Sequence, residues 1–241
     1  MLTESYSMNR CMFSLFLLTS SLCGFCASFQ NLDFDSANTN RLTDICAPNH
    51  CFYGSLSDLL PGWQLSNGAN VFGPNSPVGY NLELAGLPYD TILGASNPDN
   101  RPFEGLYSLA LYSAREPPLT GTLTPFSLWQ VGAVPSDAKS IHFLNFGFSA
   151  VELLINGSPV PLLLDGSFDH TRVHLVNAAA DISVYAGQSI ELRFTTTDHD
   201  LSGLDSISFS DQPVPEPGAL ALFCVGALLL LWRFRLRSGS Y

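Results

Sequence analysis

Lysine is almost missing from this sequence: Lys139 is the only one in 241 residues, and ten basic residues stand against 21 acidic ones. The formal net charge is −11, and residues 28–213 alone carry 19 acidic and six basic side chains. Binding to the phosphate backbone of nucleic acids needs clustered lysine and arginine. The composition therefore argues against a nucleic-acid partner, and it suits solubility, divalent cations or basic partners without choosing among them.

Three sequence motifs of enzymes are also missing: Gly-x-Ser-x-Gly, His-Glu-x-x-His and the P-loop. Carboxylates are plentiful, but no pair of them stands out as a general acid and base. We therefore expect a protein without enzymatic activity. A secreted glycoside or ester hydrolase is the alternative, together with a purely structural surface protein.

Helical periodicity is lacking between residues 28 and 212. Short segments rich in β-branched and aromatic residues are separated there by glycine, proline, asparagine and aspartate, and the segment 189–195 alternates strictly between apolar and polar side chains. This pattern predicts an all-β fold, an antiparallel β-sandwich of the jelly-roll type, over residues 28–212. The expected strands are Phe29–Phe34, Trp63–Leu65, Tyr80–Leu84, Gly105–Tyr112, Phe126–Val131, Ser140–Phe146, Val151–Ile155, Val160–Leu164, Thr171–Val176, Ser189–Thr196 and Asp205–Phe209.

Only two of the six cysteines, Cys46 and Cys51, fall inside this predicted body. An even pair in an exported domain is most simply oxidised, so we predict a disulfide between them. Two unpaired thiols are the alternative. A zinc site is less favoured because no second Cys or His pair has a matching spacing.

The N-terminal segment 1–27 has the layout of a secretory signal peptide. Arg10 precedes an uncharged apolar run from Cys11 to Ala27, which ends in small residues. We expect cleavage near Ala27–Ser28. An uncleaved N-terminal anchor is the alternative.

The C-terminal segment 213–241 has three parts. Val214-Pro215-Glu216-Pro217 is followed by an apolar run over residues 218–232, and this run ends at Trp232 before Arg233, Arg235 and Arg237. An interfacial tryptophan and flanking arginines are typical of a transmembrane helix whose arginines stay cytoplasmic. The alternative is a buried core helix with a basic tail. The order of the three parts resembles the PEP-CTERM sorting signal of bacterial surface proteins. This resemblance implies an exosortase-type membrane protease as partner and hosts that make extracellular polysaccharide.

The body resembles galactose-binding-like jelly rolls in its opening residues 29–35, in Pro61-Gly62-Trp63 and in its ending, Tyr185-Ala186-Gly187-Gln188 and 203–209. This resemblance implies a structural Ca²⁺ between the first and last strands, with Asp33, Asp35 and Asp205 as ligands, against ordinary edge carboxylates as the alternative. Sugar rings stack on aromatic side chains, so Trp63 and Trp129 are candidate ligand contacts, unless both are core residues.

These inferences combine into one prediction. The chain is exported, is held in the inner membrane with its body outside the cytoplasm, and is then sorted to the cell surface or the extracellular space. There the body binds extracellular carbohydrate or another matrix polymer.

Overall fold

The computed structural model describes residues 27–44, 52–68, 70–81, 89–94, 103–113, 125–168, 173–197 and 201–214. Several predictions lie outside these residues: the signal peptide up to residue 26, the Cys46–Cys51 disulfide, the motif residues 215–217, and the apolar run 218–232 with Arg233, Arg235 and Arg237. Within the described ranges, no helix is both long and apolar enough to cross a membrane.

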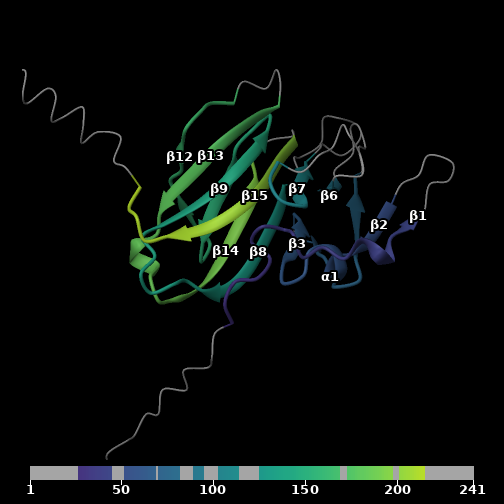
Figure 1. Cartoon of the computed structure of the whole chain (residues 1–241), viewed down its shortest axis with the longest axis horizontal. Coiled ribbons are helices and arrows are strands. Elements are labelled where there is room, and N and C mark those ends of the chain that lie inside the picture. Colours follow the sequence, from purple (N-terminus) through teal and green to yellow (C-terminus); the bar gives the residue numbers. More distant parts are fainter. Residues whose placement is uncertain are drawn as a thin grey trace, which may run out of the picture.

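The described chain is almost entirely β-structure, arranged in two large sheets (Figure 1). The nine-stranded sheet has the order β1 (Thr43–Asp44), β2 (Phe52–Ser55), β5 (Pro77–Tyr80), β6 (Tyr89–Gly94), β7 (Tyr107–Tyr112), β15 (Leu201–Ser210), β9 (Ser140–Gly147), β13 (His174–Asp181) and β12 (Leu163–Leu164). The six-stranded sheet has the order β11 (Ser158–Val160), β10 (Val151–Ile155), β14 (Ser189–Thr196), β8 (Phe126–Ala133), β3 (Gln64–Asn67) and β4 (Asn70–Val71). The described helices are single short turns: η1 (Thr39–Arg41), α1 (Leu56–Leu59) and η2 (Ser183–Tyr185).

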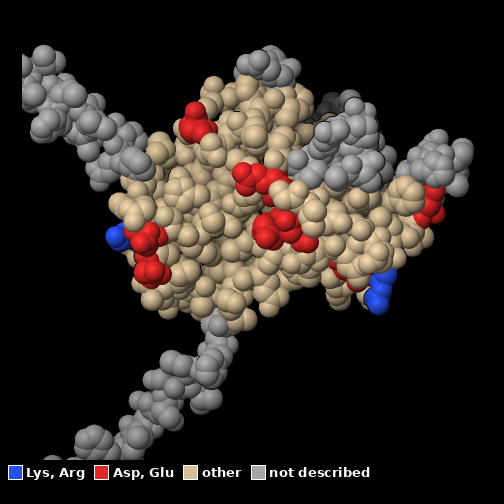
Figure 2. Space-filling view, viewed as in Figure 1, with Lys and Arg blue, Asp and Glu red and all other residues tan. Residues whose placement is uncertain are grey.

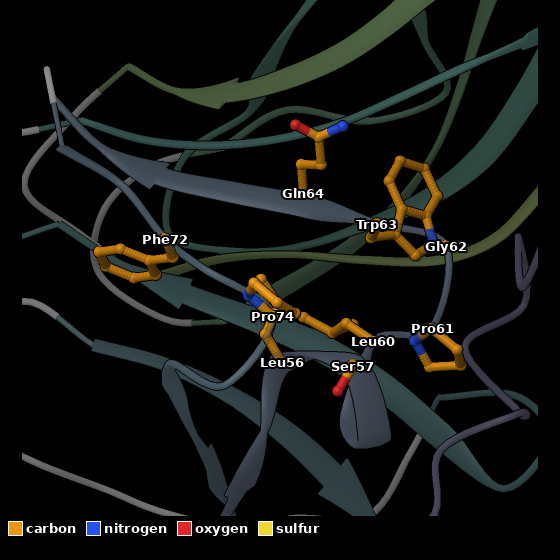
Figure 3. A pocket seen from close by; sticks show the side chains of 9 residues that line it. All are labelled: Leu56, Ser57, Leu60, Pro61, Gly62, Trp63, Gln64, Phe72 and Pro74. Carbon is orange, nitrogen blue, oxygen red and sulfur yellow. The ribbon is translucent and has the colours of Figure 1, made fainter.

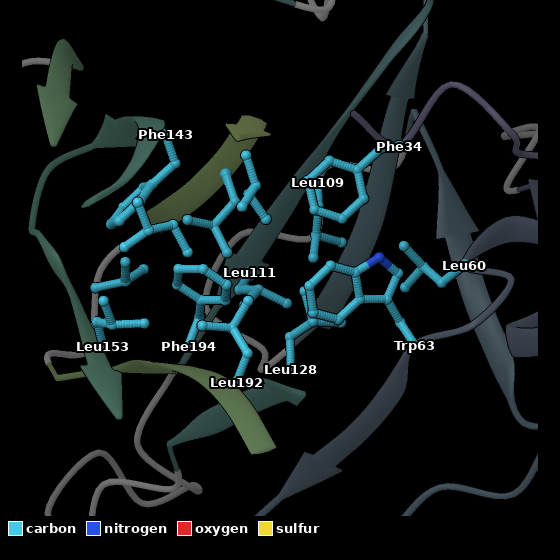
Figure 4. Packing of buried hydrophobic residues seen from close by; sticks show 14 of the residues in the cluster. Phe34, Leu60, Trp63, Leu109, Leu111, Leu128, Phe143, Leu153, Leu192 and Phe194 are labelled. Atoms are coloured by element: carbon cyan, nitrogen blue, oxygen red, sulfur yellow. The ribbon is translucent and has the colours of Figure 1, made fainter. Parts of the chain in front are cut away.

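The predicted all-β class is confirmed, and among the described strands every neighbouring pair is antiparallel except β5–β6, which is parallel. Apolar side chains at every second strand position point into the space between the two sheets and form the core. Along β14, Ile190, Leu192 and Phe194 are buried, while the residues between them are partly exposed. Phe143 of the facing sheet meets Phe194 edge to face, with ring centroids 5.1 Å apart (Figure 4).

Two predicted strands and one predicted turn that rest on local sequence patterns are found in the structure. Val151–Ile155 and Ser189–Thr196 are strands with the predicted bounds, and Asn156-Gly157 forms the turn between β10 and β11 as expected. Both turn residues have positive φ, +51° and +76°, which matches the twist of a two-residue hairpin.

Two strand predictions are wrong. Residues 29–34 form turns instead of a strand, since Asn31 and Phe34 have φ of +50° and +59°, and Phe34 points into the core against Trp63. Residues 160–164 do not form one strand. The chain leaves the six-stranded sheet after β11, passes Pro161 and joins the nine-stranded sheet as β12, because proline has no N–H to continue a ladder.

Candidate functional site

The outward face of the six-stranded sheet carries a row of large side chains. Leu154 of β10 pairs with Arg193 of β14, Arg193 with Trp129 of β8, and Trp129 with Gln64 of β3. Directly paired residues point to the same side of a sheet, so these four side chains form one line across four strands, about 14 Å long. Their neighbours in sequence, such as Leu128 and Leu192, point the other way and are buried in the core.

Arg193 and Trp129 form the centre of this row. The Arg193 guanidinium carbon lies 4.3 Å from the centroid of the Trp129 ring, and its Nε donates a hydrogen bond of 2.9 Å to Glu191 Oε1. Trp129 is only 7 % exposed, yet it lies outside the core cluster between the sheets. The guanidinium plane therefore covers the ring, and the stacked pair is held in place by Glu191.

The adjoining row on the same face is polar. Glu152 of β10 pairs with Thr195, and Thr195 pairs with Ser127, whose hydroxyl is 2.9 Å from that of Thr195. Hydroxyl, amide, guanidinium and carboxylate groups thus stand side by side on one surface. Such groups, mixed with flat hydrophobic faces, are the means by which proteins bind sugars.

Trp63, the other predicted ligand aromatic, is 4 % exposed and belongs to the core. Its ring packs between Phe34 and Phe194, at centroid distances of 5.8 and 6.3 Å (Figure 4). The indole Nε1 donates a 2.8 Å hydrogen bond to the Asn31 carbonyl, which satisfies its only polar group. These contacts match the alternative stated above, in which Trp63 is a core residue.

A cavity of about 430 Å³ lies beside α1, at the start of β3 (Figure 3). In this view the side chain of Gln64 turns away from Pro61 and Leu60. The cavity is mainly apolar, and its polar side chains are those of Ser57 and Gln64. Gln64 is also the last residue of the row on the outward face of the six-stranded sheet, so the cavity adjoins that face. The residues lining it are Leu56, Ser57, Leu60, Pro61, Gly62, Trp63, Gln64, Phe72 and Pro74.

Asp35 and Asp205 both hold the turn that precedes β7. Asp35 Oδ1 accepts hydrogen bonds from the N–H groups of Leu106 and Tyr107, at 2.6 and 3.0 Å. Asp205 Oδ2 accepts from the Glu104 N–H at 2.9 Å and the Ser108 hydroxyl at 2.6 Å. The two carboxylates therefore fix one turn from opposite ends of the sequence.

The same turn is shaped by Gly105, which has φ of +59°, and a Cβ added there would collide with the Asp35 carboxylate. Asp205 is 1 % exposed, and burial raises its pKa, although hydrogen bonds from Ser108, Glu104 and Ser206 act in the opposite direction. Asp33 is exposed and accepts a hydrogen bond from the Asp35 N–H at 3.2 Å.

The three predicted calcium ligands thus lie near the same turn, but Asp35 and Asp205 already accept hydrogen bonds from N–H and hydroxyl groups there. Across the described part of the chain, no three His, Cys, Asp or Glu side chains are grouped so that they could hold a metal ion.

Asp90 of β6 is a buried group that the sequence did not single out. The residue is 8 % exposed, its Oδ2 has no hydrogen-bond partner among the residues that the structure describes, and burial raises its pKa to about 7. The short segment Tyr89–Gly94 gives no hint of this, because burial of a polar strand residue depends on which elements lie against it.

Residues 213–237 match the model of the PEP-CTERM protein-sorting motif, which contains Val214 and the predicted Pro215-Glu216-Pro217. This motif indicates export and sorting to the cell surface, and it implies processing by an exosortase. No curated protein shows a significant match to the chain.

Two solved structures are similar in outline. TmCBM61, solved in complex with beta-1,4-galactotriose, has 14 % identity and a TM-score of 0.37, with 77 % of this chain and 99 % of that chain covered. The enzymatically active domain of tailspike protein 4 of bacteriophage CBA120 has 10 % identity and a TM-score of 0.34, with 62 % of this chain and 19 % of that chain covered. At such low TM-scores, neither likeness indicates what this chain binds.

Proposed function

We propose that this chain is an exported surface protein whose β-sandwich body binds extracellular polysaccharide on the outward face of the six-stranded sheet. The observation that carries the proposal is the Arg193 guanidinium, stacked 4.3 Å from the Trp129 ring centroid and bonded to Glu191. A planar group with spare N–H donors, beside a carboxylate acceptor, suits the paired hydroxyls of a sugar ring. The sorting motif supports the proposal because it indicates sorting to the cell surface, where polysaccharide is available.

Delivery to that surface is the second part of the proposal. The signal peptide takes the chain across the inner membrane, and the apolar run 218–232 halts in the bilayer with its arginines on the cytoplasmic side. An exosortase then cleaves at or near Pro215-Glu216-Pro217. The Cys46–Cys51 disulfide belongs to the same proposal, because it requires the oxidising space outside the cytoplasm.

Binding is tested by co-sedimentation of the full-length chain with insoluble polysaccharides, for example cellulose, xylan and galactan. We expect Arg193→Ala and Trp129→Ala to weaken binding by about tenfold or more, the usual cost of losing a central contact. Leu175→Ala is the matched control, since Leu175 is 52 % exposed on the other sheet and should leave binding unchanged. The proposal fails if the wild type binds none of the polymers, or if the control weakens binding as much as the two variants.

Structural Ca²⁺ at Asp33, Asp35 and Asp205 stays a prediction. Ligand binding to the folded state raises its stability by mass action, so added Ca²⁺ should raise the melting temperature of the wild type. Asp205→Asn should abolish that rise. An unchanged melting temperature at millimolar Ca²⁺ would count against the site.

A hydrolase is the alternative function; Asp90 has the pKa of about 7 that a general acid needs, but its carboxyl is buried in the nine-stranded sheet, away from the proposed binding face. Release of reducing ends from the polysaccharides used for binding would support this alternative, provided that Asp90→Asn abolishes it.

A self-assembling structural protein is disfavoured by the sheet edges. The outermost described strands, β1, β12, β11 and β4, have only two or three residues each, which offers little backbone for pairing between molecules.

A further inference from the structure

The charges on the outward face of the six-stranded sheet decide which polysaccharides it can accept. Arg193 is the cation of this face among the described residues, and its Nε is bonded to Glu191. Glu152 is exposed in the adjoining row. The described residues of this face therefore carry one positive and two negative side chains, and this net negative charge does not favour an anion.

The rest of the body adds to this negative field. Of the other described cations, Arg41 lies beside the nine-stranded sheet, with its Nη1 3.8 Å from Asp58 Oδ1. Lys139 precedes β9 of the same sheet. Figure 2 shows patches of acidic side chains and few Lys or Arg on the face in view. With 19 acidic and six basic residues over 28–213, the field around the body repels polyanions at distances up to about 10 Å in 0.1 M salt.

We propose that this face selects neutral over acidic polysaccharide and that Glu191 sets the selection. This inference rests on the proposed function. A uronic acid placed on the row would meet two carboxylates, Glu191 and Glu152, against the single charge of Arg193, so like-charge repulsion and lost hydration oppose its binding. A neutral sugar can use the same carboxylates as hydrogen-bond acceptors. Glu191 thus has two roles: it orients Arg193 for a neutral sugar and cancels the charge that would attract an acidic one.

The experiment compares each acidic polymer with its own carboxyl-reduced form, so that backbone and linkage stay constant while the charge changes. Polygalacturonate, alginate and hyaluronan are suitable, and binding of the full-length chain is measured at low and at high NaCl. We expect the wild type to bind a reduced form at least about tenfold better than its acidic parent, a difference of about 1.4 kcal/mol. This preference should shrink at high salt, because salt screens repulsion.

Glu191→Gln frees the guanidinium of Arg193 without changing the size of the side chain. It should raise binding to the acidic form by about tenfold at low salt, and this gained binding should now fall as salt rises. The double variant Glu191→Gln/Arg193→Gln should lose the gain, which would assign it to Arg193. Asp137→Asn, an exposed change before β9, is the control and should alter neither form.

The outcomes separate the inference from the proposed function. Wild-type preference for the acidic form, or a Glu191→Gln variant with unchanged selectivity, overturns the inference and leaves polysaccharide binding in place. If the wild type binds neither the acidic nor the carboxyl-reduced form of any polymer, both the inference and the proposed function fail.

Discussion

Asp90 shows how one residue can make stability depend on pH. Its carboxyl is buried, and one oxygen has no hydrogen-bond partner within the described ranges, so the folded state favours the protonated form and the pKa rises from 3.8 to about 7. In the unfolded chain the same carboxyl ionises near its ordinary pKa. Between these two values the unfolded state binds fewer protons than the folded state, so stability falls as pH rises.

We therefore expect the free energy of unfolding to drop between about pH 4 and pH 7, by up to about 1.4 kcal/mol per pH unit from this residue. Asp90→Asn should remove most of that slope, because the amide does not ionise. Urea unfolding at several pH values measures it, with the exposed Asp137→Asn as control. A slope that is the same in wild type and Asp90→Asn would contradict this account.

At the scale of the element, the turn between β10 and β11 shows where local sequence decides structure. Asn156 and Gly157 both adopt positive φ, and Asn156 Oδ1 also accepts a 2.9 Å hydrogen bond from the Glu191 N–H. The turn thus ties the hairpin to β14 beside the proposed binding row. Residues 29–34 show the opposite case. Their aromatic residues predicted a strand, but the chain turns there and Phe34 fills the core, and only contacts with other elements decide this.

Gly157→Ala should destabilise the protein by about 1 kcal/mol, since an L-residue at φ of +76° is strained although no atom lies near the new Cβ. Gly73→Ala is the matched control, because its Cβ also meets nothing within 4 Å and its φ lies outside the left-handed region. We expect that change to be neutral or slightly stabilising. Equal effects of the two changes in thermal unfolding would show that backbone strain is not the cause.

At the scale of the whole molecule, the body ends just before the sorting signal. The Ser140 hydroxyl at the start of β9 donates a 2.6 Å hydrogen bond to the Gln212 carbonyl, and the matched motif begins at residue 213. A protease that acts on the motif would therefore meet the chain next to the point where it leaves the nine-stranded sheet.

Replacing Pro215, Glu216 and Pro217 together by alanine should block processing and leave most of the protein in the inner-membrane fraction. Cell fractionation with mass spectrometry of the mature C-terminus measures this. Asp211→Ala, an exposed change immediately upstream, is the control and should be processed normally. Wild-type processing of the triple variant would refute the role of the motif.

The sequence alone determined the features that depend on contiguous residues. The sorting motif, the all-β class, the strands 151–155 and 189–196 and the Asn156-Gly157 turn follow from local pattern, because alternation and turn chemistry act over a few residues. Only the tertiary structure decided that Trp63 is buried in the core between the sheets while Trp129 is covered by Arg193 on the outward face. It also decided that Asp35 and Asp205 accept hydrogen bonds from the same turn. Both tryptophans read alike as aromatic strand residues. Their roles differ because strand pairing brings together residues that are distant in the chain, and this pairing fixes which face of a sheet is covered.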